Sequence, residues 1–183
     1  MASLKMCFAR ASLIAWSGFA VLCMSTPGLA QPTETDVKAA FLPRFARYVT
    51  WPPAVAPRGD APFTLCVIGD DRFGRVLDQA IRSQSVDGRR IALRKMKEPS
   101  GVAGCHVAFV QGTKLRPVDQ MLATIGRQPV LTVTDAANAP KRGVIHFVVD
   151  KGRVRFFIDQ GAAQRRGLNI SSRLLTLAIG VTQ

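Results

Sequence analysis

The sequence predicts a single α/β domain in which helices flank both faces of a mostly parallel sheet, with an antiparallel hairpin at its C-terminal end. Short apolar runs alternate with segments of helical periodicity along most of the chain, and this alternation is typical of buried parallel strands joined by helices. Two further strand-like runs near the end flank a turn signal, which indicates the hairpin. The 183 residues, 48% of them hydrophobic, exclude a disordered or collagen-like chain.

Residues 1–30 have the three parts of a secretory signal peptide. They contain no Asp or Glu, and Lys5 and Arg10 lie at the front. An apolar run follows over 11–24, and Ala30 ends a stretch of small residues that suits a cleavage site. The sequence therefore predicts export across the inner membrane, with cleavage after Ala30.

Cleavage at that point leaves a domain of residues 31–183 that lies in the periplasm. The alternative is an uncleaved anchor, but the apolar run is shorter than the roughly twenty residues that a membrane span needs. Cys23 does not indicate a lipoprotein, because Leu22 stands where lipidation signals need a small side chain.

The first element of the domain is predicted to be a helix capped by Asp36. Pro43 lies inside the helical pattern, where a proline should kink or break it. Trp51 and the two prolines that follow end the segment, and a loop runs to Pro62. The apolar positions that follow the 3.6-residue period are Val37, Phe41, Phe45, Tyr48 and Val49.

From Phe63 onward the strands and helices of the sheet alternate. Apolar runs predict buried strands at 63–69, 106–111 and 129–134, and an alternating run predicts an exposed strand at 90–96. Helical spacing predicts helices at 73–84 and 117–125, and a helical turn at 161–166.

The C-terminal end differs from this pattern. The runs 144–149 and 153–158 flank Asp150-Lys151-Gly152, which predicts the hairpin. Ser171 can cap a last helix that runs to Ile179 and is apolar on nearly all sides. Such a helix must pack into the core or dock onto a second subunit.

The mature chain is strongly basic. Without Lys5 and Arg10, 23 of the 25 Lys and Arg residues remain against 12 Asp and Glu, which gives a net charge near +11. In the periplasm such a surface suits anionic lipid headgroups, cell-wall polymers or an acidic protein patch, or it is only a solvated surface. No nucleic-acid partner is predicted, because aromatic residues do not alternate with the basic ones.

Cys66 and Cys105 are the two cysteines of the mature chain. In an oxidising compartment they can form one disulfide, and closing a loop of about 40 residues stabilises a fold by about 4 kcal/mol. Two buried free thiols are the alternative.

Motifs for catalysis, metal binding or cofactor binding were not found. The segment Gly69–Gly74 has the spacing of a phosphate loop but lacks its Lys and Ser or Thr. His106 and His146 lie within strand patterns and are interpreted as structural. Asp70 or Asp71 is predicted to cap the following helix. No catalytic residue, metal or cofactor is therefore predicted, although a hydrolase without a motif stays a third alternative.

Seven stretches of the chain recur, in this order and spacing, in a known family. They are Val37–Pro52 apart from Pro43, Arg44 and Thr50, Leu65–Gly74 apart from Arg72, Gly104–Val110, Val130–Asp135, Gly143–Phe147, Arg153–Phe156 and Gly167–Leu175. Together they resemble the YfiR family of small periplasmic proteins, over nearly all of the mature chain.

The resemblance implies a non-enzymatic, dimeric periplasmic protein that represses an inner-membrane diguanylate cyclase by binding its periplasmic sensor region. Such a repressor controls cyclic-di-GMP signalling, and through it biofilm formation and motility. Cys66 and Cys105 match a family cysteine pair that can form a disulfide. The chain departs from the family at Pro43-Arg44 and at Phe157-Ile158-Asp159, where Glu-Ile-Asn is common.

The end of the first helix is the predicted partner-binding surface, because aromatic and arginine side chains are the usual anchors of protein interfaces. The leucine-rich last helix is a second candidate, and for both the alternative is that they belong to the core. The other function class is a periplasmic module that binds a small ligand without a cyclase partner, with Asp70 and Asp71 lining a crevice. The predicted partner-binding residues are Phe41, Arg44, Phe45, Arg47, Tyr48 and Trp51.

Overall fold

The computed structural model describes residues 31–137, 139 and 141–183, so the predicted signal peptide of residues 1–30 lies outside the described residues. Residues 32–183 form one compact unit. Among the described residues, no helix is both long and apolar enough to span a bilayer.

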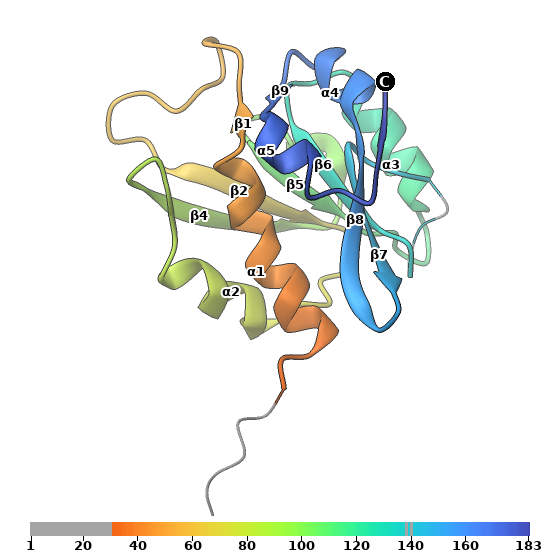
Figure 1. Cartoon of the computed structure of the whole chain (residues 1–183). Helices are drawn as coiled ribbons and strands as arrows, with labels where there is room; N and C mark the ends of the chain where they lie inside the picture. Colours follow the sequence, from red (N-terminus) through yellow and green to blue (C-terminus); the bar gives the residue numbers. More distant parts are fainter. Residues whose placement is uncertain (1–30, 138, 140) are drawn as a thin grey trace, which may run out of the picture. The chain divides into compact units, whose positions relative to one another are not determined.

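An eight-stranded sheet forms the centre of this unit (Figure 1). Its strands are β2 (Phe63–Ile68), β3 (Ser85–Val86), β4 (Arg89–Met96), β5 (Val107–Val110), β6 (Leu131–Asp135), β7 (Ile145–Asp150), β8 (Arg153–Asp159) and β10 (Gly180–Thr182). They lie in the order β10-β8-β7-β6-β5-β2-β4-β3. The run from β4 to β7 is parallel, while β8 is antiparallel to β7. The predicted mostly parallel sheet with a C-terminal hairpin is therefore confirmed.

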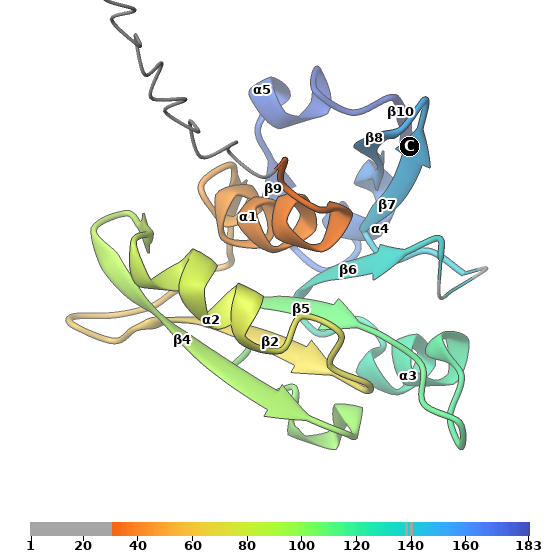
Figure 2. The ribbon, with the colours of Figure 1, turned by 90° about the horizontal axis from the view of Figure 1, so that it is seen from below.

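Helices cover both faces of this sheet, as the sequence predicts. The helices α1 (Glu34–Ala46) and α2 (Arg75–Arg82) lie on one face, and α3 (Val118–Ile125) lies on the other (Figure 2). Side chains alternate across β2: Leu65 and Val67 belong to the core under α1 and α2, and Cys66 and Ile68 belong to the core under α3. Both faces of the central strands are thus buried.

Five short elements complete the fold of the described residues. A single 3-10 turn, η1 (Pro99–Gly101), follows β4. A second sheet pairs β1 (Val49–Thr50) with β9 (Asn169–Ile170) in antiparallel register. The last helices are α4 (Gln160–Gln164) and α5 (Ser172–Leu175).

The start of α1 differs from the prediction. Thr33 is the N-cap: its hydroxyl oxygen accepts a hydrogen bond from the Asp36 backbone N–H, and the Asp36 carboxylate accepts one from the Thr33 backbone N–H. This reciprocal pair is a capping box, so Asp36 lies inside the helix rather than before it. Pro43 does not break the helix, which continues to Ala46. A proline here removes one hydrogen bond, and the burial of Leu42 and Phe45 on either side holds the last turn in place.

The predicted last helix is wrong in its second half. Ser171 caps α5 as expected, but α5 ends at Leu175. The chain then turns, the Ile179 backbone N–H donates to the Phe156 carbonyl, and β10 pairs with β8 in parallel register. The helical spacing of the leucines is overridden, because the open edge of β8 offers backbone hydrogen-bond partners to this segment.

Candidate functional site

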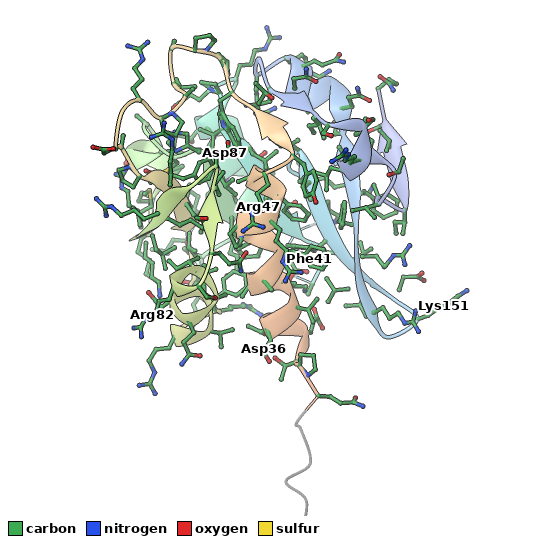
Figure 3. All side chains as sticks on the ribbon, turned by 60° about the vertical axis from the view of Figure 1, so that its left-hand side comes forward. Asp36, Phe41, Arg47, Arg82, Asp87 and Lys151 are labelled. Atoms are coloured by element: carbon green, nitrogen blue, oxygen red, sulfur yellow. A yellow bond between two sulfur atoms is a disulfide. The ribbon has the colours of Figure 1, made fainter. Side chains whose placement is uncertain are left out.

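Part of the predicted partner-binding surface follows the exposed side of α1. Asp36, Phe41 and Arg47 follow one another along the helix (Figure 3). The side chains of Arg44 and Arg47 are exposed. The Arg47 guanidinium donates to the Ser85 carbonyl oxygen at 3.1 Å, which holds it against β3. Two cations therefore lie on the surface at the end of α1.

The aromatic residues of the same prediction divide between surface and core. Phe45 is 1% exposed and Trp51 is 8% exposed, so neither offers its ring to a partner in this conformation. The Trp51 indole N–H donates to the His106 carbonyl oxygen at 3.2 Å, which makes it a structural anchor of β5. Phe41 and Tyr48 are half-buried. The surface that a partner could reach is thus smaller than the predicted set: Phe41, Arg44, Arg47 and Tyr48.

Cys66 and Cys105 form the predicted disulfide. Cys66 lies within β2, and Cys105 comes two residues before the neighbouring β5. The parallel pairing of β2 with β5 brings their Cα atoms to 5.9 Å, within the range that a disulfide needs. Both cysteines are buried, at 0% and 4% exposure. The bond therefore links two central strands inside the core under α3.

Both histidines have structural surroundings. The His106 Nδ1 atom accepts from the Thr64 backbone N–H at 2.9 Å, and its Nε2 atom lies 3.1 Å from the Val55 carbonyl oxygen. These contacts fix the neutral tautomer that carries its proton on Nε2. Burial lowers the pKa of His106, although the two backbone hydrogen bonds act in the opposite direction. Burial and, second, the charge of Arg142 lower the pKa of His146.

Asp70 and Asp71 lie in the loop after β2 but do not cap α2, which is a correction to the prediction. Gly74 is the N-cap residue of α2, and the Asp71 carboxylate accepts from the Phe73 and Gly74 backbone N–H groups within the loop. Lys95 pairs with Asp71 at 2.9 Å, and Lys97 pairs with Asp70 at 3.2 Å. Both carboxylates are thus already paired with cations at the surface.

The strand ends approach each other closely between β2 and β5. Gly69 has a φ of +94°, and a Cβ atom placed on it would lie 1.8 Å from the Gln111 carbonyl oxygen. Only glycine fits this position, since it has no Cβ and tolerates a left-handed backbone. The loops after β2 and β5 therefore pack directly against each other and fix the backbone of Gln111.

Beside this contact lies a polar cleft of about 170 Å³ between the first turns of α1 and the ends of β5 and β6. Lys38 is 4% exposed and donates to the Asp135 carboxylate at 2.5 Å and to Glu34. Gln111 is 3% exposed, and its Oε1 atom has no hydrogen-bond partner among the described residues. A buried acceptor without a partner costs about 1–3 kcal/mol, so this position is unusual for a folded protein.

Sequence reasoning did not single out Lys38, Gln111 or Asp135. For Lys38 there is a signal: it lies three residues before Phe41 and seven before Phe45, on the face of α1 that the helical period buries. For Gln111 and Asp135 the signal is their position at the ends of apolar strand runs. Which strand ends would be neighbours depends on the order of the strands in the sheet.

The cleft lies at the carboxyl ends of the central strands. Three or more His, Cys, Asp or Glu side chains that could together hold a metal ion were not found within 31–137, 139 and 141–183. A doubly wound sheet binds its ligands outside the carboxyl ends of its strands, where the strand order reverses. Fold and cleft together define a doubly wound α/β protein with a polar crevice at its strand ends.

The chain belongs to the YfiR/HmsC-like family, whose family model matches residues 35–179. The resemblance found in the sequence is thereby confirmed over nearly the whole described domain. The YfiR-like family is a family of periplasmic regulatory proteins. No curated protein matches the chain.

Proposed function

We propose that the chain is a periplasmic regulatory protein that binds the periplasmic sensor region of an inner-membrane diguanylate cyclase and represses it. The observation that carries this proposal is the family match over residues 35–179. Binding lowers the cyclase output, and the fall in cyclic-di-GMP limits biofilm formation. The protein acts by occupying the sensor region and carries out no reaction.

Export precedes this function in the proposal. Residues 1–30 act as a signal peptide, and the mature domain of residues 31–183 begins near Gln31. N-terminal sequencing of protein recovered from the periplasm tests this step. The expected first residue is Gln31, and a periplasmic chain that begins at Met1 would contradict the proposal.

The partner contact lies at the end of α1 in this proposal. Arg44 and Arg47 are exposed cations there, and Phe41 and Tyr48 offer part of their rings beside them. Such a surface suits an acidic patch on the sensor region, because complementary charge speeds association more than it raises affinity. A contact of the basic mature chain with anionic lipids or with the cell wall is also compatible with this proposal.

In this proposal the chain also associates with a second copy, through the edge of the sheet that β10 forms. The strand β10 ends the sheet; Val181 within it is 38% exposed, and Leu177 and Ile179 just before it are 57% and 36% exposed. An open strand edge with apolar side chains is a template for pairing with a second copy. We therefore expect a homodimer through β10, which the mass of the mature protein in solution tests.

A deletion strain tests the repressor role directly. Cellular cyclic-di-GMP should rise in the deletion strain and return to its earlier level when the wild-type gene is restored. Cross-linking in intact cells should recover a membrane protein with a cyclase domain. If cyclic-di-GMP does not rise and no membrane partner is recovered, the repressor role is rejected in favour of a small-ligand module without a cyclase partner.

Charge reversal tests the contact surface. The double change Arg44→Glu and Arg47→Glu should slow association with the sensor region and reduce its dependence on salt, since fewer charge pairs steer the encounter. Arg82→Glu is the matched control, because Arg82 is also exposed but lies at the end of α2. Circular dichroism should show the same fold in all three proteins. If the double variant and the control associate with the sensor region at equal rates, the contact lies on another surface of the protein.

A further inference from the structure

The polar cleft beside α1 has a built interior. It lies where the ends of β5 and β6 meet the first turns of α1, and its walls include Glu34, Lys38, Arg72, Phe109, Gln111 and Asp135. Its side chains come from four separate parts of the chain. The cleft is therefore a product of the fold and not of one loop.

One of the residues that line this cleft has an unpartnered acceptor. Gln111 is 97% buried, and its Oε1 atom has no hydrogen-bond partner in the part of the chain that the structure describes. The close packing of Gly69 on the Gln111 carbonyl holds the backbone of this residue in place. A ligand that donates an N–H or O–H group to Oε1 satisfies this acceptor.

The same cleft is lined by four charged side chains. Lys38 is paired with buried Asp135 and with half-exposed Glu34, so its charge is already balanced within the wall of the cleft. Arg72 is exposed at the mouth, and no carboxylate of the described residues pairs with it. A guanidinium presents two parallel N–H donors, which fit the two oxygens of a carboxylate.

We propose that this cleft binds a small carboxylate that carries a hydrogen-bond donor on the adjacent carbon. The carboxylate pairs with Arg72 at the mouth, and the donor, a hydroxyl or an ammonium group, reaches Gln111 Oε1. A volume of about 170 Å³ holds about five to six water molecules, so the ligand has only a few non-hydrogen atoms. The site goes beyond the repressor role and does not depend on a cyclase partner.

Three probes of matched size test the proposal on the mature protein. L-lactate carries a hydroxyl beside its carboxylate, L-alanine carries an ammonium group there, and propionate carries no donor. Backbone amide NMR signals of Lys38, Gln111 and Asp135 should shift on titration with lactate, with alanine or with both. Propionate should bind at least about tenfold more weakly, the usual effect of one lost hydrogen bond in a buried site. The probe that binds more tightly identifies the donor.

Two variants with matched controls assign the contacts. Gln111→Leu removes the acceptor and should abolish the preference for lactate or alanine over propionate, while Gln120→Leu, an exposed change on α3, should keep it. Arg72→Gln should weaken binding of the preferred probe at least about tenfold, and Arg75→Gln should not. The arginine comparison involves exposed residues only, so it holds even if Gln111→Leu fails to fold.

Several results would overturn the proposal. They are the absence of any shift around the cleft with all three probes, equal binding of propionate, or unchanged binding in both Gln111→Leu and Arg72→Gln. None of these results bears on cyclic-di-GMP in the deletion strain, so this site and the repressor role are tested separately.

Discussion

The two faces of the sheet are stabilised in different ways. On the aromatic face, under α1, the rings of Phe41, Phe45, Phe147 and Phe156 form a cluster with centroids 5.1 to 6.2 Å apart. On the disulfide face, under α3, the buried side chains are smaller, among them Ile68, Ala108, Val110, Met121 and Ile125, and the Cys66–Cys105 bond links two strands.

The difference shows how one chain stabilises two cores of unequal size. An aromatic side chain buries about 150–250 Å² in typical proteins, so each ring of the aromatic face buries more apolar area than a small side chain of the other face. A core of small side chains buries less, and a cross-link stabilises it by limiting the unfolded chain. The aromatic face therefore depends on packing and the disulfide face on a covalent bond.

The largest expected effect is on the aromatic face. Phe45→Ala removes a ring that is 1% exposed and packs on Phe147 and Phe156, so the free energy of unfolding should fall by about 3–5 kcal/mol. Urea denaturation measures the change, with Val149→Ala as the control at an exposed position. If Phe45→Ala lowers the free energy of unfolding no more than the control does, the aromatic cluster does not stabilise this face.

The disulfide comes next. Replacing Cys66 and Cys105 by Ala should lower the free energy of unfolding by about 2–5 kcal/mol. Hydrogen exchange should quicken first in α3 and β5, while α1 keeps its protection, because the bond supports only the disulfide face. Two free thiols per chain in unreduced, denatured protein would contradict the bond itself.

The buried ion pair between Lys38 and Asp135 is the polar part of the aromatic face. It therefore extends the comparison of the two faces from apolar packing to charged groups. Lys38→Met leaves Asp135 buried without its cation and should lower the free energy of unfolding by about 3 kcal/mol. This value is at the low end of the usual range, because Glu34, the other partner of Lys38, is half-exposed. The double change Lys38→Met and Asp135→Leu should recover most of the loss. A double variant less stable than Lys38→Met would reject this account.

The smallest expected effect concerns pH at the junction of the two faces. His106 follows Cys105 directly and stacks on Phe63 at 4.6 Å. Burial lowers its pKa below the usual 6.5, so the unfolded state binds protons more tightly than the folded state. Stability is therefore full above pH 6.5 and falls as the pH drops toward the lowered value. Urea denaturation of the wild type and of His106→Gln at several pH values should show a weaker dependence in the variant, and stability that rises on acidification would contradict the sign.

Much of the sheet could be predicted because each strand is marked by the composition of its own short stretch of sequence. Runs such as Phe63–Gly69 and His106–Gln111 are apolar throughout, and a strand buried on both faces needs that composition wherever it lies. The hairpin was predictable for a similar reason. Lys151 and Gly152 both have positive φ values, of 49° and 72°, which the two-residue turn requires.

The partner surface and the last helix were predictable only in part. The period of α1 gives the same spacing to Phe41 and Phe45, but only packing on β7 and β8 leaves the first half-buried and the second inside the core. The helix predicted to reach Ile179 stops early, because β8 lies beside it and accepts backbone hydrogen bonds. The spacing of residues within one segment cannot show such hydrogen-bond partners, because they belong to another part of the chain.

The sequence by itself determined the alternation of strands and helices, the two cysteines able to pair and the family. These depend on composition and on neighbours along the chain, which every folded form of this chain shares. Only the tertiary structure decided that Lys38, Gln111 and Asp135 meet in one cleft. They are 73 and 24 residues apart along the chain, and they become neighbours because the parallel crossovers place the ends of β5 and β6 side by side beneath α1.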